Sequence, residues 1–142
     1  MNWNAHKDMP VHDGLVWPDT MPRTKMVLPS VGASFLYVSL SHIQKALAQL
    51  SYMVSLRVSN VIASFNSGSA TADDAGFVVY FKLGRNDRFL ACDRYSSVEA
   101  NAAAVIKLIR HLHEIAENVS IACFNQIMTS FDQPLKPKSQ GE

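Results

Sequence analysis

The residue pair best suited to catalysis is Cys92 and Asp93, at the end of an apolar run. A thiolate nucleophile needs a base beside it and a third group that orients the base. Adjacent residues on a strand point to opposite faces, which argues against Asp93 as that base. We expect Cys92 to pack as a reduced thiol, and Asp93 to cap the next helix or pair with Arg94. An enzyme centred on Cys92 and Asp93 is the least favoured alternative.

Metal and carboxylate chemistry have little support in the residue spacing. His111 and His113 are two apart in a helical pattern, so they point about 200° apart and cannot hold one ion together. The paired carboxylates Asp73 and Asp74 fall in a run of small polar residues, where acid–base groups are poorly preorganised. Neither a phosphate-binding glycine loop nor a zinc motif occurs in the sequence. We therefore expect no metal and no cofactor.

Basic side chains gather in one part of the chain. The 142 residues carry a formal net charge of only +1, unlike a histone-like protein or an acidic DNA mimic. Within residues 41–96, however, six basic residues stand against four acidic ones. Aromatic and basic side chains together are typical of a single-strand binding surface. The candidate nucleic-acid contacts, on or beside a predicted hairpin, are Lys82, Arg85, Arg88, Arg94 and Tyr95.

The first 30 residues differ from the rest in composition. They hold four of the six prolines and both tryptophans, and they show neither the helical nor the strand period. Proline fixes φ and lacks a backbone donor, so this arm should be extended or turning. Trp3 and Trp17 either fasten the arm onto its own domain or, with Arg23, anchor it on a partner protein, because tryptophan is enriched in interface hot spots.

Apolar spacing after the arm predicts helices and strands in a definite order. Residues 34–40 are a short strand or an apolar lead-in to a helix. That helix, over residues 41–56, has a capping-box pair in Ser41 and Gln44 at its start. The remaining elements are strands over residues 58–65, 76–83 and 88–92, a loop over 66–75, a turn over 84–87, and helices over 96–117 and 120–131.

These elements predict one α+β domain. We expect a three-stranded antiparallel sheet, with room for a fourth short strand, packed against two main helices. The core has the order α-β-β-β-α, and an extra C-terminal helix follows. The arm covers residues 1–30, the domain residues 31–133, and a flexible tail residues 134–142.

The sequence predicts a cytoplasmic protein. It has no secretory signal and no apolar run near the ~18 residues of a membrane span. Its two cysteines, Cys92 and Cys123, lie among apolar neighbours, so we expect both to be buried, reduced thiols.

The α-β-β-β-α order resembles the double-stranded-RNA-binding fold. Proteins of that family place lysines at the start of the last helix, where they meet phosphates. Here residues 96–101 read Ser-Ser-Val-Glu-Ala-Asn and contain no lysine. Duplex-RNA binding of that kind is therefore not expected.

A second set of matches covers residues 20–137. The matching stretches are Pro22-Arg23-Thr24, Val58 to Asn66, Asp74 to Phe81, Cys92 to Tyr95 with Val98, Glu99 and Asn101, and Phe131 with Pro134. In order and spacing they resemble the N-terminal module of bacterial phage and prophage proteins labelled J-domain proteins, in which a DnaJ-like domain follows. The matching polar or aromatic positions are Arg23, Tyr80, Phe81, Cys92, Asp93, Arg94, Tyr95 and Asn101.

This resemblance implies a phage or mobile-element accessory protein. No His-Pro-Asp tripeptide occurs, so the chaperone-activating role of a J domain is not implied. We expect a non-enzymatic protein that binds nucleic acid or a nucleic-acid-handling complex. The alternative is a protein-interaction adaptor, an inhibitor or subunit of a host or defence complex, that docks through its arm.

Overall fold

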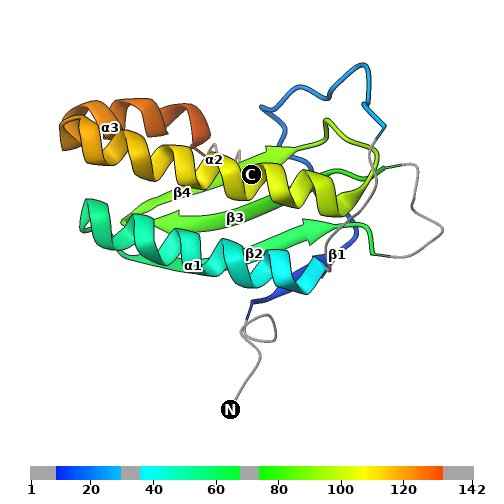
Figure 1. Cartoon of the computed structure of the whole chain (residues 1–142), viewed down its shortest axis with the longest axis horizontal. Coiled ribbons are helices and arrows are strands. Elements are labelled where there is room, and N and C mark those ends of the chain that lie inside the picture. The colour runs from blue at the N-terminus through cyan, green and yellow to red at the C-terminus, as the bar shows by residue number, and fades with distance from the viewer. Residues whose placement is uncertain (1–8, 30–35, 68–73, 133–142) are drawn as a thin grey trace, which may run out of the picture.

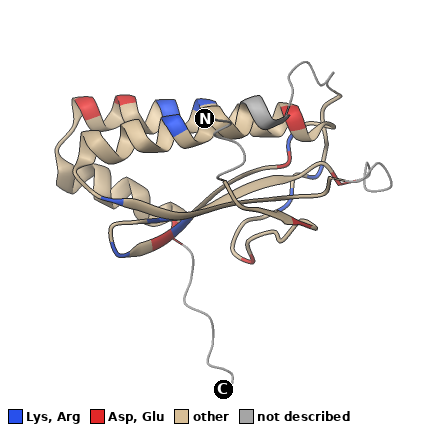
Figure 2. Cartoon of the chain, turned by 90° about the horizontal axis from the view of Figure 1, so that it is seen from below, with Lys and Arg blue, Asp and Glu red and all other residues tan. Residues whose placement is uncertain are grey.

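Two layers make up the fold, a mixed sheet and the helices that cover one of its faces (Figures 1 and 2). The computed structural model describes residues 9–29, 36–67 and 74–132. In chain order the elements are β1 (Val11–Asp13), α1 (Leu36–Val54), β2 (Val58–Phe65), β3 (Phe77–Leu83), β4 (Asn86–Cys92), α2 (Val98–Asn118), α3 (Ile121–Met128) and a 3-10 turn, Thr129–Phe131. The predicted α+β class, with two main helices on a sheet and an extra C-terminal helix, is confirmed.

The sheet has four strands in the order β1-β2-β3-β4. Strand β1 runs parallel to β2, and the other neighbours are antiparallel. The predicted antiparallel strands are therefore present, and the fourth strand comes from the arm. Of the two alternatives for residues 34–40, the strand is wrong for residues 36–40, which form the start of α1; residues 34 and 35 lie outside the described ranges.

The early start of α1 follows from its apolar spacing. Leu40, Ile43 and Leu47 are buried and stand at i, i+3 and i+7, so the stripe that faces the sheet already includes Leu40. Ser41 and Gln44 consequently lie inside the helix instead of capping it. Among the helices in the described ranges, none combines the length and apolar character needed to cross a bilayer.

The core lies between the sheet and the helices α1 and α2, which run side by side across it (Figure 1). Strand β3 alternates, as its sequence predicts: one face carries buried Phe77, Val79, Phe81 and Leu83. From α2 the core receives Ala102, Val105, Ile109, Leu112 and Ala116. Alanines at both ends of this stripe allow the helix to approach the sheet closely.

The described part of the arm, residues 9–29, lies against its own domain. Met9 is buried in the core, and β1 pairs with β2 at Val11–Ala63 and Asp13–Phe65. The arm continues past β3, where the Tyr80 hydroxyl donates to the Val16 carbonyl at 2.6 Å. It then reaches the far edge of the sheet beyond β4, where the Leu28 N–H donates to the Arg94 carbonyl at 2.8 Å. The arm thus spans the sheet from edge to edge at one end.

Candidate functional site

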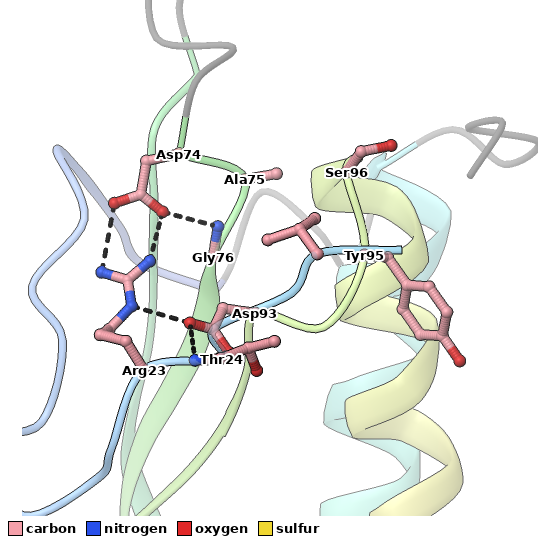
Figure 3. A pocket seen from close by; sticks show the side chains of 9 residues that line it. Arg23, Thr24, Asp74, Ala75, Gly76, Asp93, Tyr95 and Ser96 are labelled. Carbon is pink, nitrogen blue, oxygen red and sulfur yellow. Dashed lines mark hydrogen bonds and ion pairs between the residues drawn. The ribbon is translucent and has the colours of Figure 1, made fainter. Parts of the chain in front are cut away.

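Arg23 of the arm lies between two aspartates (Figure 3). Its Nε donates to Oδ2 of Asp93 at 2.7 Å. Its two terminal nitrogens donate to both oxygens of Asp74, at 2.6 and 3.3 Å. We call Arg23, Asp74 and Asp93 the Arg23 cluster. It joins the arm, the segment before β3 and the segment after β4.

The sheet register places both carboxylates at one end. Strands β3 and β4 are antiparallel and pair Phe77 with Cys92, so the residues before β3 and after β4 are neighbours. Backbone donors complete the arrangement: the Thr24 N–H donates to Asp93 and the Gly76 N–H to Asp74.

Gly76 lies close to the arm. A Cβ on Gly76 would lie 2.8 Å from Cδ2 of Leu15 and 3.3 Å from the Trp17 ring. The tip of the Leu15 side chain would have to shift to make room for it, so the arm and the segment before β3 are in tight contact here.

The charges of the Arg23 cluster stabilise one another. The hydrogen bond from Arg23 holds the pKa of Asp74 below its usual range. Burial raises the pKa of Asp93, but hydrogen bonds from Thr24 and Arg23 outweigh it and leave that pKa lowered as well. The same pairing with Asp74 raises the pKa of Arg23. A general acid or base needs a pKa near the working pH, so these shifts point away from acid–base catalysis.

A cavity of about 300 Å³ opens beside the Arg23 cluster (Figure 3). This volume is at the lower end of the range for small-molecule sites. Tyr95 and Val27 form part of its wall, and its charged wall residues are the three members of the cluster. Those charges are already paired with one another, so the cavity offers a ligand little electrostatic attraction.

Cys92 is half-buried and donates through its Sγ to Oδ1 of Asn101 at 3.3 Å. Burial raises the pKa of the thiol. The neighbouring Asp93 is held by Arg23 and Thr24. The pair therefore lacks the nucleophile–base geometry that a catalytic cysteine requires.

This geometry predicts different reactivities for the two thiols. Cys123 is exposed, so the burial predicted for it is wrong. We expect it to react with an aromatic disulfide reagent at least about tenfold faster than Cys92 at pH 8, because thiolate fraction and access set the rate. The reaction should therefore have a fast and a slow phase, and the single variants Cys92→Ser and Cys123→Ser show which thiol gives each phase. A fast phase that survives in Cys123→Ser would contradict the packing role of Cys92.

Asn101 is fully buried in α2, and both polar atoms of its side chain form hydrogen bonds. Its Oδ1 accepts from the Tyr95 N–H at 2.9 Å and from Cys92. Its Nδ2 donates to the carbonyls of Ala75 and Tyr95, at 2.7 and 3.0 Å. Asn101 thus fastens the β4–α2 connection to the segment before β3, directly behind the cavity.

The predicted nucleic-acid contacts do not come together as one group. Lys82 and Arg85 lie at the β3–β4 turn, whereas Arg94 and Tyr95 lie beyond the other end of β4. At about 3.4 Å per residue, the seven residues of β4 separate the two groups by roughly 20 Å. The Arg94 guanidinium lies over the Tyr95 ring, 5.7 Å from its centroid.

Arg88 is removed from the predicted set because it is buried, with only 5% of its surface exposed. Strand alternation puts it on the helix-facing side, paired with Phe81 of β3. Its Nη1 donates to the Met128 carbonyl at 2.6 Å and to the Asp132 carboxylate. It therefore joins the α3 end to the edge of β4 and presents little of its charge to an external phosphate.

Arg57 is a residue that the sequence prediction missed. The Gly84 N–H donates to the Arg57 carbonyl at 2.8 Å, which places Arg57 beside the β3–β4 turn. That turn is tight: Leu83 pairs with Asn86, and Gly84 has φ +63°, as in a type II′ turn with glycine first. We call the surface around Arg57, Lys82 and Arg85 the hairpin end. The signal for Arg57 was its place directly before a strand that pairs with β3.

The predicted partner-binding residues of the arm contact each other. Trp17 donates through Nε1 to the Met21 carbonyl at 2.6 Å. The Arg23 guanidinium lies 4.5 Å from the centroid of the Trp17 ring, a cation–π geometry. Trp3 lies outside the described residues.

No three His, Cys, Asp or Glu side chains within the described ranges come together as a metal site. Comparison of the chain with protein-family models, with curated proteins and with solved structures found no match.

Proposed function

We propose that this chain is a non-enzymatic accessory protein that binds nucleic acid through its hairpin end. The observation that supports it is the convergence of Arg57, Lys82 and Arg85 from two separate segments. Arg57 and Arg85 are exposed, and no carboxylate among the described residues forms a salt bridge with either. The Lys82 side chain is 39% exposed, and its Nζ lies 4.0 Å from Oδ1 of Asp87. At this distance and exposure the ion pair is weak.

The distribution of paired and unpaired charge favours an anionic partner. The described ranges hold ten basic and nine acidic residues. Two arginines, Arg23 and Arg88, form salt bridges with Asp74, Asp93 and Asp132. Eight basic and six acidic residues remain, so the rest of the surface has a positive excess of two. Phosphates are attracted by such an excess in a salt-dependent way.

The resemblance to phage and prophage modules supports the same proposal, since those modules are usually met among genes for phage replication and defence. The adaptor alternative has less support. Arg23 is paired with Asp74 and Asp93 of the domain, and its guanidinium lies over the Trp17 ring, so a partner that docks through these side chains competes with contacts they already make. Loss of the arm would also remove β1 and the buried Met9.

The test is fluorescence anisotropy with labelled single-stranded DNA, duplex DNA and RNA at 50 and 200 mM salt. We compare the wild type with the triple variant Arg57→Gln, Lys82→Gln, Arg85→Gln. The matched control removes three exposed charges from the outer helix faces: Lys45→Gln, Lys107→Gln, Arg110→Gln.

We expect wild-type affinity for duplex DNA to fall with salt at a slope of about −3, as for three phosphate contacts. The hairpin-end variant should bind at least about tenfold more weakly at 50 mM, and the control within about threefold. Absence of salt-dependent binding by the wild type, or equal losses in both variants, would overturn the proposal.

A further inference from the structure

Tyr52 is an aromatic side chain that the fold does not cover. It lies in the last turn of α1 and is 88% exposed. Residues one turn away on the same helix face, Ala48, Gln49 and Ser55, are also exposed, so nothing large shields the ring along the helix. An aromatic ring in water gains no burial energy for its own domain. Its surface is open to a partner.

The backbone ties Tyr52 to the hairpin end. Directly before it, Ser51 accepts from the Leu56 N–H at 3.2 Å and donates its hydroxyl to the Leu56 carbonyl at 2.5 Å. Ser55, with φ +58°, reverses the chain between them. Leu56 packs against Gly84 of the β3–β4 turn. The end of α1 and the hairpin turn therefore lie at the same end of the molecule, as Figure 1 shows.

We propose that Tyr52 stacks on a base of single-stranded nucleic acid whose phosphates are held by Arg57 and Arg85. This inference rests on the proposed function and names its ligand class. The bases of a duplex stack on each other, whereas those of a single strand are free to stack on an aromatic side chain. An exposed ring at the same end of the molecule as unpaired cations fits the pattern of a single-strand platform. An acidic protein partner is the competing occupant.

The experiment compares Tyr52→Ala, Tyr52→Phe and a control, Met26→Ala, by anisotropy at 50 mM salt. Met26 is 77% exposed in the arm, so its truncation removes apolar surface elsewhere. Each protein is titrated with labelled oligothymidine and with a mixed-sequence duplex. Alanine is the stronger helix former, so Tyr52→Ala keeps α1, which circular dichroism verifies.

We expect Tyr52→Ala to bind oligothymidine about 5- to 100-fold more weakly, the range for loss of one stacked base. Tyr52→Phe, which retains the ring, and Met26→Ala should stay within about twofold, and duplex affinity should change little in all three.

Unchanged oligothymidine affinity in Tyr52→Ala would overturn the inference and leave Tyr52 as a candidate protein contact. Equal losses for oligothymidine and duplex would overturn it too. The hairpin-end triple variant separates this result from failure of the proposed function. If that variant loses binding to both ligands while Tyr52→Ala keeps single-strand binding, only the stacking role is wrong.

Discussion

Replacement of Asn101 by alanine is expected to lower the free energy of unfolding by about 3–4 kcal/mol, as much as truncation of a large apolar side chain in the core. The side chain is fully buried and makes four hydrogen bonds. Its removal leaves one N–H, of Tyr95, and two carbonyls, of Tyr95 and Ala75, without these partners. A buried backbone group left unpaired costs about 1–3 kcal/mol; these three hydrogen bonds are part-buried, so water and relaxation recover part of the sum. Urea denaturation followed by circular dichroism measures the change.

Asn118→Ala is the matched control. Asn118 lies on the same helix but is exposed, and it donates only to the Glu114 carbonyl, at 2.7 Å. Its replacement should change stability by no more than about 0.5 kcal/mol, as for other surface positions. Similar small losses in the two variants would show that water replaces the partners of Asn101 and that the connection behind the cavity is not held by this side chain.

The core of the fold could be predicted because local patterns and burial agree there. In β3, alternating Phe77, Val79, Phe81 and Leu83 have one common face, and the structure buries them. The predicted helix over residues 96–117 is α2, whose buried residues include Ala102, Val105 and Ile109 at helical spacing. Strand β1 could not be predicted, because its three residues are too few to show a period and it is held by pairing with β2.

Prediction of the site failed where proximity along the chain was taken for proximity in space. Arg85, Arg88 and Arg94 are near one another in sequence, yet strand alternation turns Arg88 inward and the length of β4 separates Arg94 from the turn. Arg57 and Asp74 are distant in sequence from the groups they join, and only the sheet register brings them there. Among the positions that the resemblance marked, Arg23 and Asp93 pair beside the cavity, and Asn101 bonds to two residues that line it, Ala75 and Tyr95.

The Arg23 cluster predicts the second large effect. Asp93→Ala should lower the free energy of unfolding by about 2 kcal/mol at pH 7, because the Arg23 Nε–H and the Thr24 N–H lose their acceptor. This loss is smaller than that expected for a fully buried ion pair, because the Arg23 side chain is 46% exposed and solvent screens its charge. Asp87→Ala is the control: Asp87 is exposed, and its loss should cost under about 0.5 kcal/mol.

Low pH should lower the free energy of unfolding of the wild type through Asp74 and Asp93. The folded-state pKa values of Asp74 and Asp93 are below the usual 3.8, so near that pH the unfolded chain binds more protons than the folded one. Their contribution is therefore complete well above pH 3.8 and is lost as the pH falls through the lowered values. Urea titrations between pH 7 and pH 3 should show a steeper decline for the wild type than for Asp93→Asn.

We expect hydrogen exchange to show that the loss of the Asp93 carboxylate destabilises the arm in particular. The Leu28 N–H, which donates to the Arg94 carbonyl beside the cluster, should lose protection in Asp93→Asn even at pH 7, while the Leu90 N–H in β4 keeps most of its own. Parallel loss at both amides would mean that the Arg23 cluster supports the whole sheet. Unchanged protection of Leu28 would mean that β1 and the Tyr80 contact hold the arm without the cluster. A loss of protection confined to Leu28 would show that the pairing of Arg23 with Asp93 holds the arm against the end of the sheet.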